Sequence, residues 1–244
     1  MLIARSLPGL RWAVLAAVAA LCLAASASGG GKSVAACPAT LANQLASTGT
    51  ATQLVTVVAA SRASTQGRLQ LWWKRGDCWR ALAGPWWAWL GQRGVSDHKR
   101  EGDRTTPVGV FGFLPVMYGI DANPGVHYRY HRIVCGDWWV EDSKSRWYNR
   151  FRHVPCGSSP PFRVTSEDMS RSPTAYRHLA VIAYNTKPVV PGRGSGIFLH
   201  ASTGRPTLGC VSLPLPQLLQ VLRWLRPASS PLIAIGTRQQ IARL

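Results

Sequence analysis

His200-Ala201-Ser202-Thr203-Gly204-Arg205-Pro206-Thr207-Leu208-Gly209-Cys210-Val211-Ser212 is the most informative run of this 244-residue chain. His200 ends an apolar segment, a turn-rich loop follows, and Cys210 opens a second short apolar stretch. A nucleophilic cysteine needs a base that takes its proton and backbone amides that stabilise an oxyanion. We therefore interpret Cys210 as a nucleophile, His200 as its general base, and the backbone at Gly209 as part of an oxyanion hole.

The same residues also have plain structural explanations. Cys210 would suit a buried core position or a third disulfide, and a lone histidine at a strand end is usually a satisfied edge residue. No carboxylate lies near the run in sequence, so we expect Ser202 or a backbone carbonyl near it to orient the His200 imidazole. His127 and His131 lack partners at zinc-site spacing, so we expect no metal and no cofactor.

The cysteine count supports a free thiol. Five cysteines remain when Cys22, which lies in the N-terminal apolar segment, is set aside. In an oxidising compartment an odd number indicates one unpaired thiol, and Cys210 is the natural choice because it lies beside the histidine loop. The other four allow three pairings, of which proximity in sequence favours Cys37–Cys78 with Cys135–Cys156.

Residues 1–27 have the features of a secretory signal peptide. Arg5 and Arg11 accompany an apolar core over 12–23, and Ala25-Ser26-Ala27 is a small-residue cleavage site. The apolar run is short for a membrane span. We predict cleavage and export to the cell wall, with no integral membrane partner; an uncleaved N-terminal anchor is the alternative.

The chain is strongly basic, with 28 Lys and Arg against 10 Asp and Glu and a net charge of +18. Outside the cell such a surface favours anionic wall polymers over nucleic acid as partners. A solvated basic surface with no specific partner is an equally good explanation.

The remaining pattern predicts a mostly β protein. Residues 28–52 are small and polar and form a lead-in segment, and one large domain is expected over 53–238. Strands are predicted at 54–58, 69–74, 78–82, 86–90, 108–114, 181–184, 196–200 and 232–236. Their short length and their Gly and Pro punctuation favour an antiparallel sandwich or a barrel-like sheet.

Only one helix has a clear signal, over residues 216–225. Leu218, Leu222 and Leu225 have helical spacing and Pro227 would stop the helix. We expect it to pack behind the loop that carries Cys210. A second short helix within 166–178 is a weaker prediction.

The run from His200 to Ser212 resembles the catalytic segment of the L,D-transpeptidase family with the YkuD-type domain. That signature is an upstream histidine, a loop, then Ser or Thr, His, Gly, Cys, a hydrophobe and Asn or Arg. The corresponding residues here are Thr207, Leu208, Gly209, Cys210, Val211 and Ser212. Stretches 97–109, 138–142, 183–185 and 192–200 resemble the secreted actinobacterial-type branch of the family. Within the first of these, the stretch that contains Glu101 and Asp103 is interpreted as a tight turn, with a role in positioning substrate as the alternative.

The resemblance implies a YkuD-like β-sandwich with one or two short helices, a cysteine in a groove, and peptidoglycan stem peptides as substrates. Cys210 would attack the carbonyl of an L-residue joined to D-alanine, release D-alanine and form a thioester. A side-chain amine of a neighbouring stem would then give a crosslink. Thr207, Ser212 and Asn185 are candidate substrate-binding residues. Leu208 and Ser212 depart from the usual His and Asn or Arg, which puts substrate positioning rather than the chemistry in question.

Two alternatives remain open at this point. One is an L,D-carboxypeptidase of the same chemistry, with water as the acceptor. The other is a non-catalytic, basic, tryptophan-rich wall-binding module in which Cys210 is incidental and inert to thiol reagents.

Overall fold

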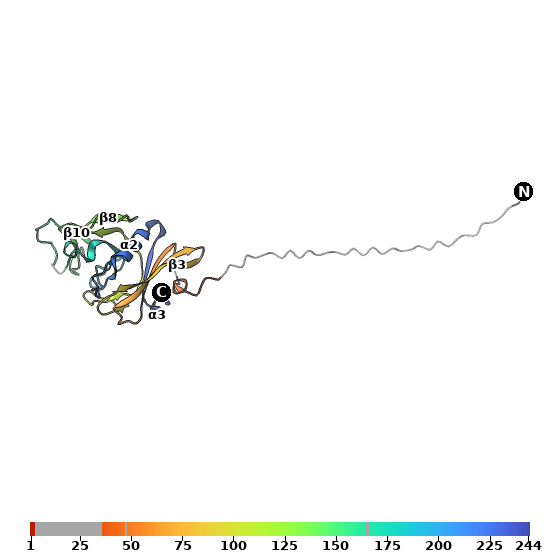
Figure 1. Cartoon of the computed structure of the whole chain (residues 1–244), viewed down its shortest axis with the longest axis horizontal. Coiled ribbons are helices and arrows are strands. Elements are labelled where there is room, and N and C mark those ends of the chain that lie inside the picture. The colour runs from red at the N-terminus through yellow and green to blue at the C-terminus, as the bar shows by residue number, and fades with distance from the viewer. Residues whose placement is uncertain (3–35, 47, 164–165) are drawn as a thin grey trace. The chain divides into compact units, whose positions relative to one another are not determined.

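The computed structural model describes residues 1–2, 36–46, 48–163 and 166–244 (Figure 1). The chain divides into two compact units, Met1–Ala36 and Cys37–Leu244, and the second contains nearly all of the described residues. The predicted signal segment, apart from its first two residues, lies outside the described part. Among the described helices, none has the length and apolar character needed to cross a membrane.

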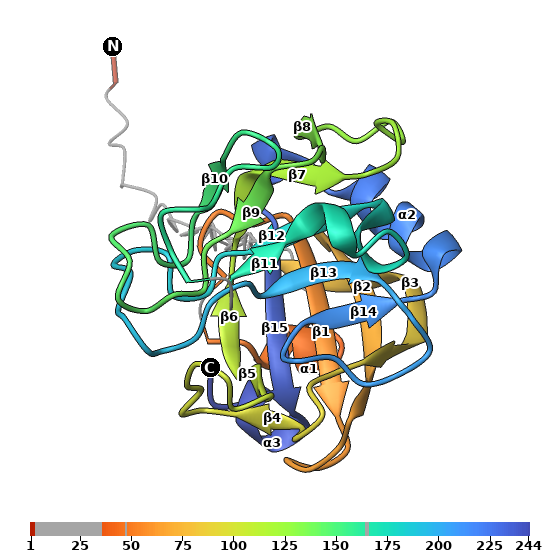
Figure 2. The same cartoon turned by 90° about the vertical axis from the view of Figure 1, so that its left-hand side faces the viewer.

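One mixed sheet of ten strands is the central element of the Cys37–Leu244 unit (Figure 2). Its strands in spatial order are β6 (Gly109–Phe111), β15 (Leu232–Thr237), β1 (Gln53–Ala59), β2 (Gln66–Arg75), β3 (Cys78–Trp89), β14 (Val211–Leu213), β13 (Phe198–Ala201), β12 (Leu179–Ile182), β7 (Phe113–Gly119) and β8 (Arg129–Arg132). The smaller sheets contain β10 (Phe151–His153), β9 (Asp137–Trp139) and β11 (Glu167–Asp168), and β4 (Val95–Ser96) with β5 (Thr106–Pro107).

The helices are few and short, so the predicted mostly β fold is confirmed. They are α1 (Leu41–Gln44), α2 (Leu215–Trp224), α3 (Arg238–Ile241) and three-residue 3-10 turns at Met169–Arg171, Ala175–Arg177 and Pro227–Ser229. The α2 helix matches the prediction to within one residue at each end. The weaker prediction over 166–178 is replaced by the first two of the 3-10 turns.

The sequence favoured antiparallel pairing, but the main sheet is mixed. β1 pairs with β15, β13 with β14, and β7 with β8 in parallel. Strand direction depends on which distant segments pair, and the period-2 pattern of each strand is the same in either direction.

Two predicted strand boundaries also differ from those in the structure. The predicted strand over 108–114 breaks at Gly112 into β6 and β7, which pair with β15 and β12 in different parts of the main sheet. The predicted break at Gly84-Pro85 is absent, because β3 runs through it with a register shift against β2. Among the described residues, β14 pairs with β3 only at Ser212 and Trp89. Pro85 lies in the part of β3 that is not paired with β14, so the N–H that proline lacks is not needed for a hydrogen bond between these two strands.

The core lies on both sides of β13 and β14. Leu199 and Val211 point to one side, where α2 packs with Leu218 and Leu222 fully buried. Each such leucine contributes roughly 1.5–3 kcal/mol by leaving water. Alternation along the strands sends Phe198 to the opposite side. The sequence predicted that this helix packs behind the loop that carries Cys210; it packs on the two strands that this loop connects.

One disulfide joins an N-terminal segment to the main sheet, and a second fastens the chain beside the small sheet of β9 and β10. Cys37 is bonded to Cys78 at the start of β3, and Cys135 to Cys156 beside β9 and β10. Both pairings are those that the sequence favoured. Cys210 is a free cysteine, as expected from the odd count.

Candidate active site

The loop from Ser202 to Cys210 connects two parallel neighbours, β13 and β14. The pairing sets Leu199 opposite Val211 and His200 opposite Ser212. Cys210 is thereby brought level with Phe198, whose N–H donates to the Cys210 Sγ at 3.3 Å. Because side chains alternate along a strand, Phe198, His200 and Cys210 share one face. The parallel register thus places the thiol and the imidazole on the same face of neighbouring strands, although no hydrogen bond joins them among the described residues.

The thiol of Cys210 is buried and held by backbone groups. It accepts the bond from Phe198 and donates to the carbonyl oxygen of Gly196 at 3.3 Å. Burial raises the pKa of the thiol to about 12; the Phe198 amide lowers it, and the charges of Glu167 and Glu141 raise it further. The thiol of Cys210 is therefore neutral.

His200 is also buried, and its imidazole is oriented by the main chain. Its Nδ1 donates to the carbonyl oxygen of Ala201 at 2.8 Å, and its ring packs edge-on against Tyr176. Ser202, the other candidate for this role, accepts from the Gly204 N–H instead. Burial lowers the pKa of His200 to about 4, against the opposing effect of the Ala201 and Ala175 carbonyls. The imidazole is therefore neutral, with its proton on Nδ1 and with Nε2 unprotonated.

Thr207 shapes the loop that presents the cysteine. Its Oγ1 donates to the Cys210 carbonyl at 2.7 Å and accepts from the Gly209 N–H at 3.1 Å. A Cβ on Gly209 would lie 2.9 Å from the Thr105 carbonyl oxygen, so the backbone here passes too closely for a larger residue. The Gly209 N–H would have to leave Thr207 before it served an oxyanion.

The other two predicted substrate-binding residues lie in different settings. Ser212 is fully buried beside His200, and its hydroxyl has no hydrogen-bond partner among the described residues. Asn185 does not line the cavity at Cys210; its side chain bonds Val190 and Gly194 within the loop that leads to β13. Asn185 thus organises backbone, and Thr207 alone of the three lines the cavity.

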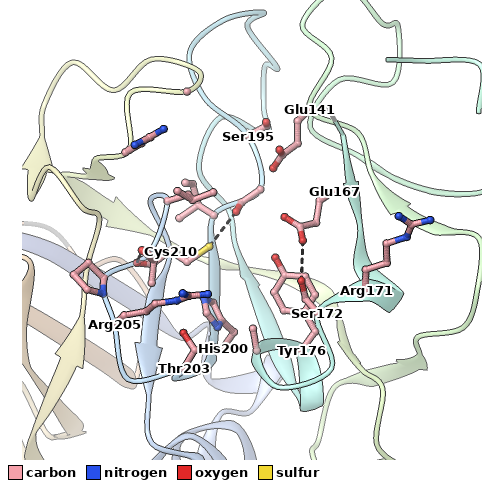
Figure 3. Close-up of a pocket in the computed structure, with 18 of the residues that line it drawn as sticks. Glu141, Glu167, Arg171, Ser172, Tyr176, Ser195, His200, Thr203, Arg205 and Cys210 are labelled. Atoms are coloured by element: carbon pink, nitrogen blue, oxygen red, sulfur yellow. Dashed lines mark hydrogen bonds between the residues drawn. The ribbon is translucent and has the colours of Figure 1, made fainter. Parts of the chain in front are cut away.

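A cavity of about 620 Å³ opens between two walls with different chemistry (Figure 3). We call one the thiol wall; it comprises Ile197, His200, Thr207 and Cys210. The carboxylate wall comprises Glu141, Glu167, Ser172 and Tyr176. Figure 3 shows Cys210 on one side, with Glu141 and Glu167 pointing toward the cavity from the other.

The carboxylate wall was not predicted from the sequence. Glu141 follows β9, Glu167 opens β11, and Tyr176 lies in a 3-10 turn. Glu101, interpreted from the sequence as part of a tight turn, also lines the cavity. Glu141 lies in stretch 138–142, which is one of the stretches that resemble the family. That resemblance suggested no role for Glu141.

Burial makes both carboxyl groups of this wall weak acids. It raises the pKa of Glu141 to about 8, with further increases from the charges of Glu167 and Glu101 and a decrease from Lys99. Burial also raises the pKa of Glu167, although hydrogen bonds from Ser172 and Tyr176 oppose this shift. Carboxylates so close to a nucleophile are typical of functional sites.

Comparison with known proteins gives the family. The model of the YkuD family, the L,D-transpeptidase catalytic domain, matches residues 56–235, so this chain belongs to that family. A search of curated proteins finds no match. A similar solved structure is the helical cell shape determining protein Pgp2 from Campylobacter jejuni, at 17% identity and a TM-score of 0.36, covering 79% of this chain. The likeness covers 53% of that protein's chain.

Proposed function

We propose that this protein is an L,D-transpeptidase that acts on peptidoglycan stem peptides through a Cys210 thioester. One observation carries the proposal: the free thiol and a neutral imidazole share one face of two parallel strands and line one cavity. The family membership supports the substrate class.

The first half-reaction forms the acyl-enzyme. The Sγ proton passes to Nε2 of His200 as sulfur attacks the carbonyl carbon of the L-residue. The resulting imidazolium is stabilised by the Ala201 and Ala175 carbonyls, which take the place of the third residue of a catalytic triad. The carbon–nitrogen bond to D-alanine then breaks, the leaving amine takes the proton from His200, and a thioester remains.

The second half-reaction transfers the acyl group. A side-chain amine of a neighbouring stem attacks the thioester carbonyl, loses a proton to His200, and forms an amide crosslink. The carbon–sulfur bond breaks, and the thiolate regains that proton. Water in place of the amine would give L,D-carboxypeptidase products, so analysis of the products distinguishes the two activities.

The location of the protein follows the same proposal. We place it outside the cytoplasm, at the cell wall, with residues 1–27 as a signal segment and the catalytic domain over 53–238. The two disulfides support an oxidising compartment. The net charge of +18 supports contact with anionic wall polymers.

Incubation with a carbapenem, followed by intact-mass measurement, tests the thiol directly. We expect one adduct on Cys210, no adduct in Cys210→Ala, and strongly slowed formation in His200→Ala. His98→Ala is the matched control, since His98 is exposed and outside the cavity. A wild-type protein that stays unmodified, with Cys210 inert to thiol reagents, would favour the wall-binding module instead.

A further inference from the structure

The carboxyl group of Glu141 has no hydrogen-bond or ion-pair partner among the described residues. The other two acids of the cavity are satisfied: Glu101 accepts from Tyr148 and from Ser195, and Glu167 accepts from Ser172 at 3.1 Å and from Tyr176. The Glu141 side chain is half-buried in the cavity lining, so part of its carboxyl group is withdrawn from water with no hydrogen bond to replace the lost solvation. Glu141 is thus the one acid of the carboxylate wall with its hydrogen-bonding capacity unused.

The backbone beside Glu141 leaves room for its carboxylate next to the nucleophile. Gly196 has a φ of +60°, and a Cβ there would stand 2.5 Å from Glu141 Oε1. The N–H of Gly196 donates to Asn149 Oδ1 at 3.1 Å, and its carbonyl accepts from the Cys210 thiol. One glycine therefore contacts the unpaired carboxylate on its Cα side and the nucleophile through its carbonyl.

The position of Glu141 has an electrostatic consequence for the nucleophile. Its negative charge, like that of Glu167, disfavours the Cys210 thiolate. Lys99 acts in the opposite sense, but it is itself paired with Asp103 at 2.8 Å. A cation placed against Glu141 would cancel part of the negative charge that opposes ionisation of the thiol.

We propose that Glu141 binds a primary ammonium group of the stem peptide, so that docking of the cationic substrate both orients it and favours the thiolate of Cys210. This inference rests on the proposed function. The ammonium would belong either to the side chain of the donor residue or to the incoming acceptor amine, and the two sources share one chemistry. In the acceptor case, Glu141 would also take the proton that the amine must lose before it attacks.

The first test measures the nucleophile without turnover. Alkylation of Cys210 by iodoacetamide, a neutral reagent, is followed from pH 6 to 10 in wild type, Glu141→Gln and Asp77→Asn. Asp77 is exposed in the β2–β3 turn and provides the control for loss of one negative charge. We expect Glu141→Gln to match wild type at pH 6 and to react about threefold faster or more above pH 8, where Glu141 is ionised.

The second test measures recognition of the ammonium group. D-Alanine release from a stem tetrapeptide with a free side-chain amine is compared with release from the same peptide acetylated on that amine. Aminolysis of the thioester by a second amine-bearing stem is measured separately. If the donor ammonium binds Glu141, wild type prefers the free-amine donor and Glu141→Gln loses about tenfold or more of that preference. If the acceptor binds there, the variant loses aminolysis and retains D-alanine release.

The proposal fails if Glu141→Gln alkylates like wild type at every pH, or if it slows both donors and aminolysis by one common factor. A common factor would indicate a structural role. Failure of the proposed function looks different: wild type would then release no D-alanine from either donor, whereas the alkylation profiles would still report the charge on Glu141. Folding of each variant is checked by thermal unfolding before either test.

Discussion

The two walls of the cavity are built in different ways. The thiol wall comes from one continuous stretch, 196–212, in which two strands and their loop place the residues that would do the chemistry. The carboxylate wall comes from 141 and 167–176, and is supported by the small sheet of β9, β10 and β11. Burial suppresses ionisation on both walls. Backbone groups hold the Cys210 thiol and the His200 imidazole, whereas side chains hold Glu167, and Glu141 is unpaired among the described residues. Under the proposed function, the thiol wall determines which reaction occurs, and the carboxylate wall determines which substrate is bound.

The largest effect is expected from removing the base of the thiol wall. His200→Gln keeps a side chain of similar volume but cannot accept the thiol proton, so acylation should fall by about 10²–10⁴-fold. The measurement is the rate of carbapenem adduct formation, with His98→Gln as the exposed control. Equal rates in the two variants would mean that His200 is not the base.

Loss of the Cys135–Cys156 disulfide should act on the support of the carboxylate wall. The bond closes a loop with a sequence separation of 21, for which chain entropy predicts a loss of about 3 kcal/mol in the free energy of unfolding. We expect the double Cys→Ser variant to lose this stability in urea denaturation and to lose preference among donor peptides before it loses carbapenem acylation. Equal loss of both would show that the two walls are one cooperative unit.

The buried imidazole should make stability depend on pH. His200 titrates at about 4 in the folded protein and near 6.5 when unfolded, so the unfolded state binds the proton first as the pH falls. Stability from this residue is complete above pH 6.5 and is lost toward pH 4, by up to about 3 kcal/mol. His200→Gln lacks this titrating group, whereas all other titrating groups are common to both proteins. As the pH falls from 6.5 to 4, wild type should therefore lose unfolding free energy relative to His200→Gln, and the difference between them should narrow or reverse.

A smaller effect compares two glycines in the segment before β13. Gly192→Ala introduces strain at a φ of +80° with nothing within 4 Å, and should cost about 1 kcal/mol. Gly196→Ala adds the collision with Glu141 and should cost about 2–3 kcal/mol. Thermal unfolding measures both. Equal losses would mean that Glu141 moves aside freely and that Gly196 does not define the gap between the walls.

Local pattern predicted much of this molecule. The apolar segment ending at His200 and the helix over 216–225 were accessible because neighbouring residues carry the signal. Both disulfides were accessible because they join the cysteines that are nearest in sequence once Cys22 and Cys210 are set aside. The split of 108–114 at Gly112 was not, since a run of seven apolar and glycine residues has the same pattern whether it forms one strand or two. The parallel direction of β13 and β14 was also hidden, because alternation has no direction. The catalytic roles of Cys210, His200 and Gly209 remain predictions.

By itself the sequence determined which side chains could do chemistry at the thiol wall: a free cysteine, a histidine ten residues before it, and strands whose alternation aligns them. The tertiary structure decided that Glu141, Glu167 and Tyr176 face that cysteine across one cavity. They lie far from Cys210 along the chain and meet it only because distant strands pair. Periodicity reports on how a segment is buried, and it contains no information about which distant segment completes the burial.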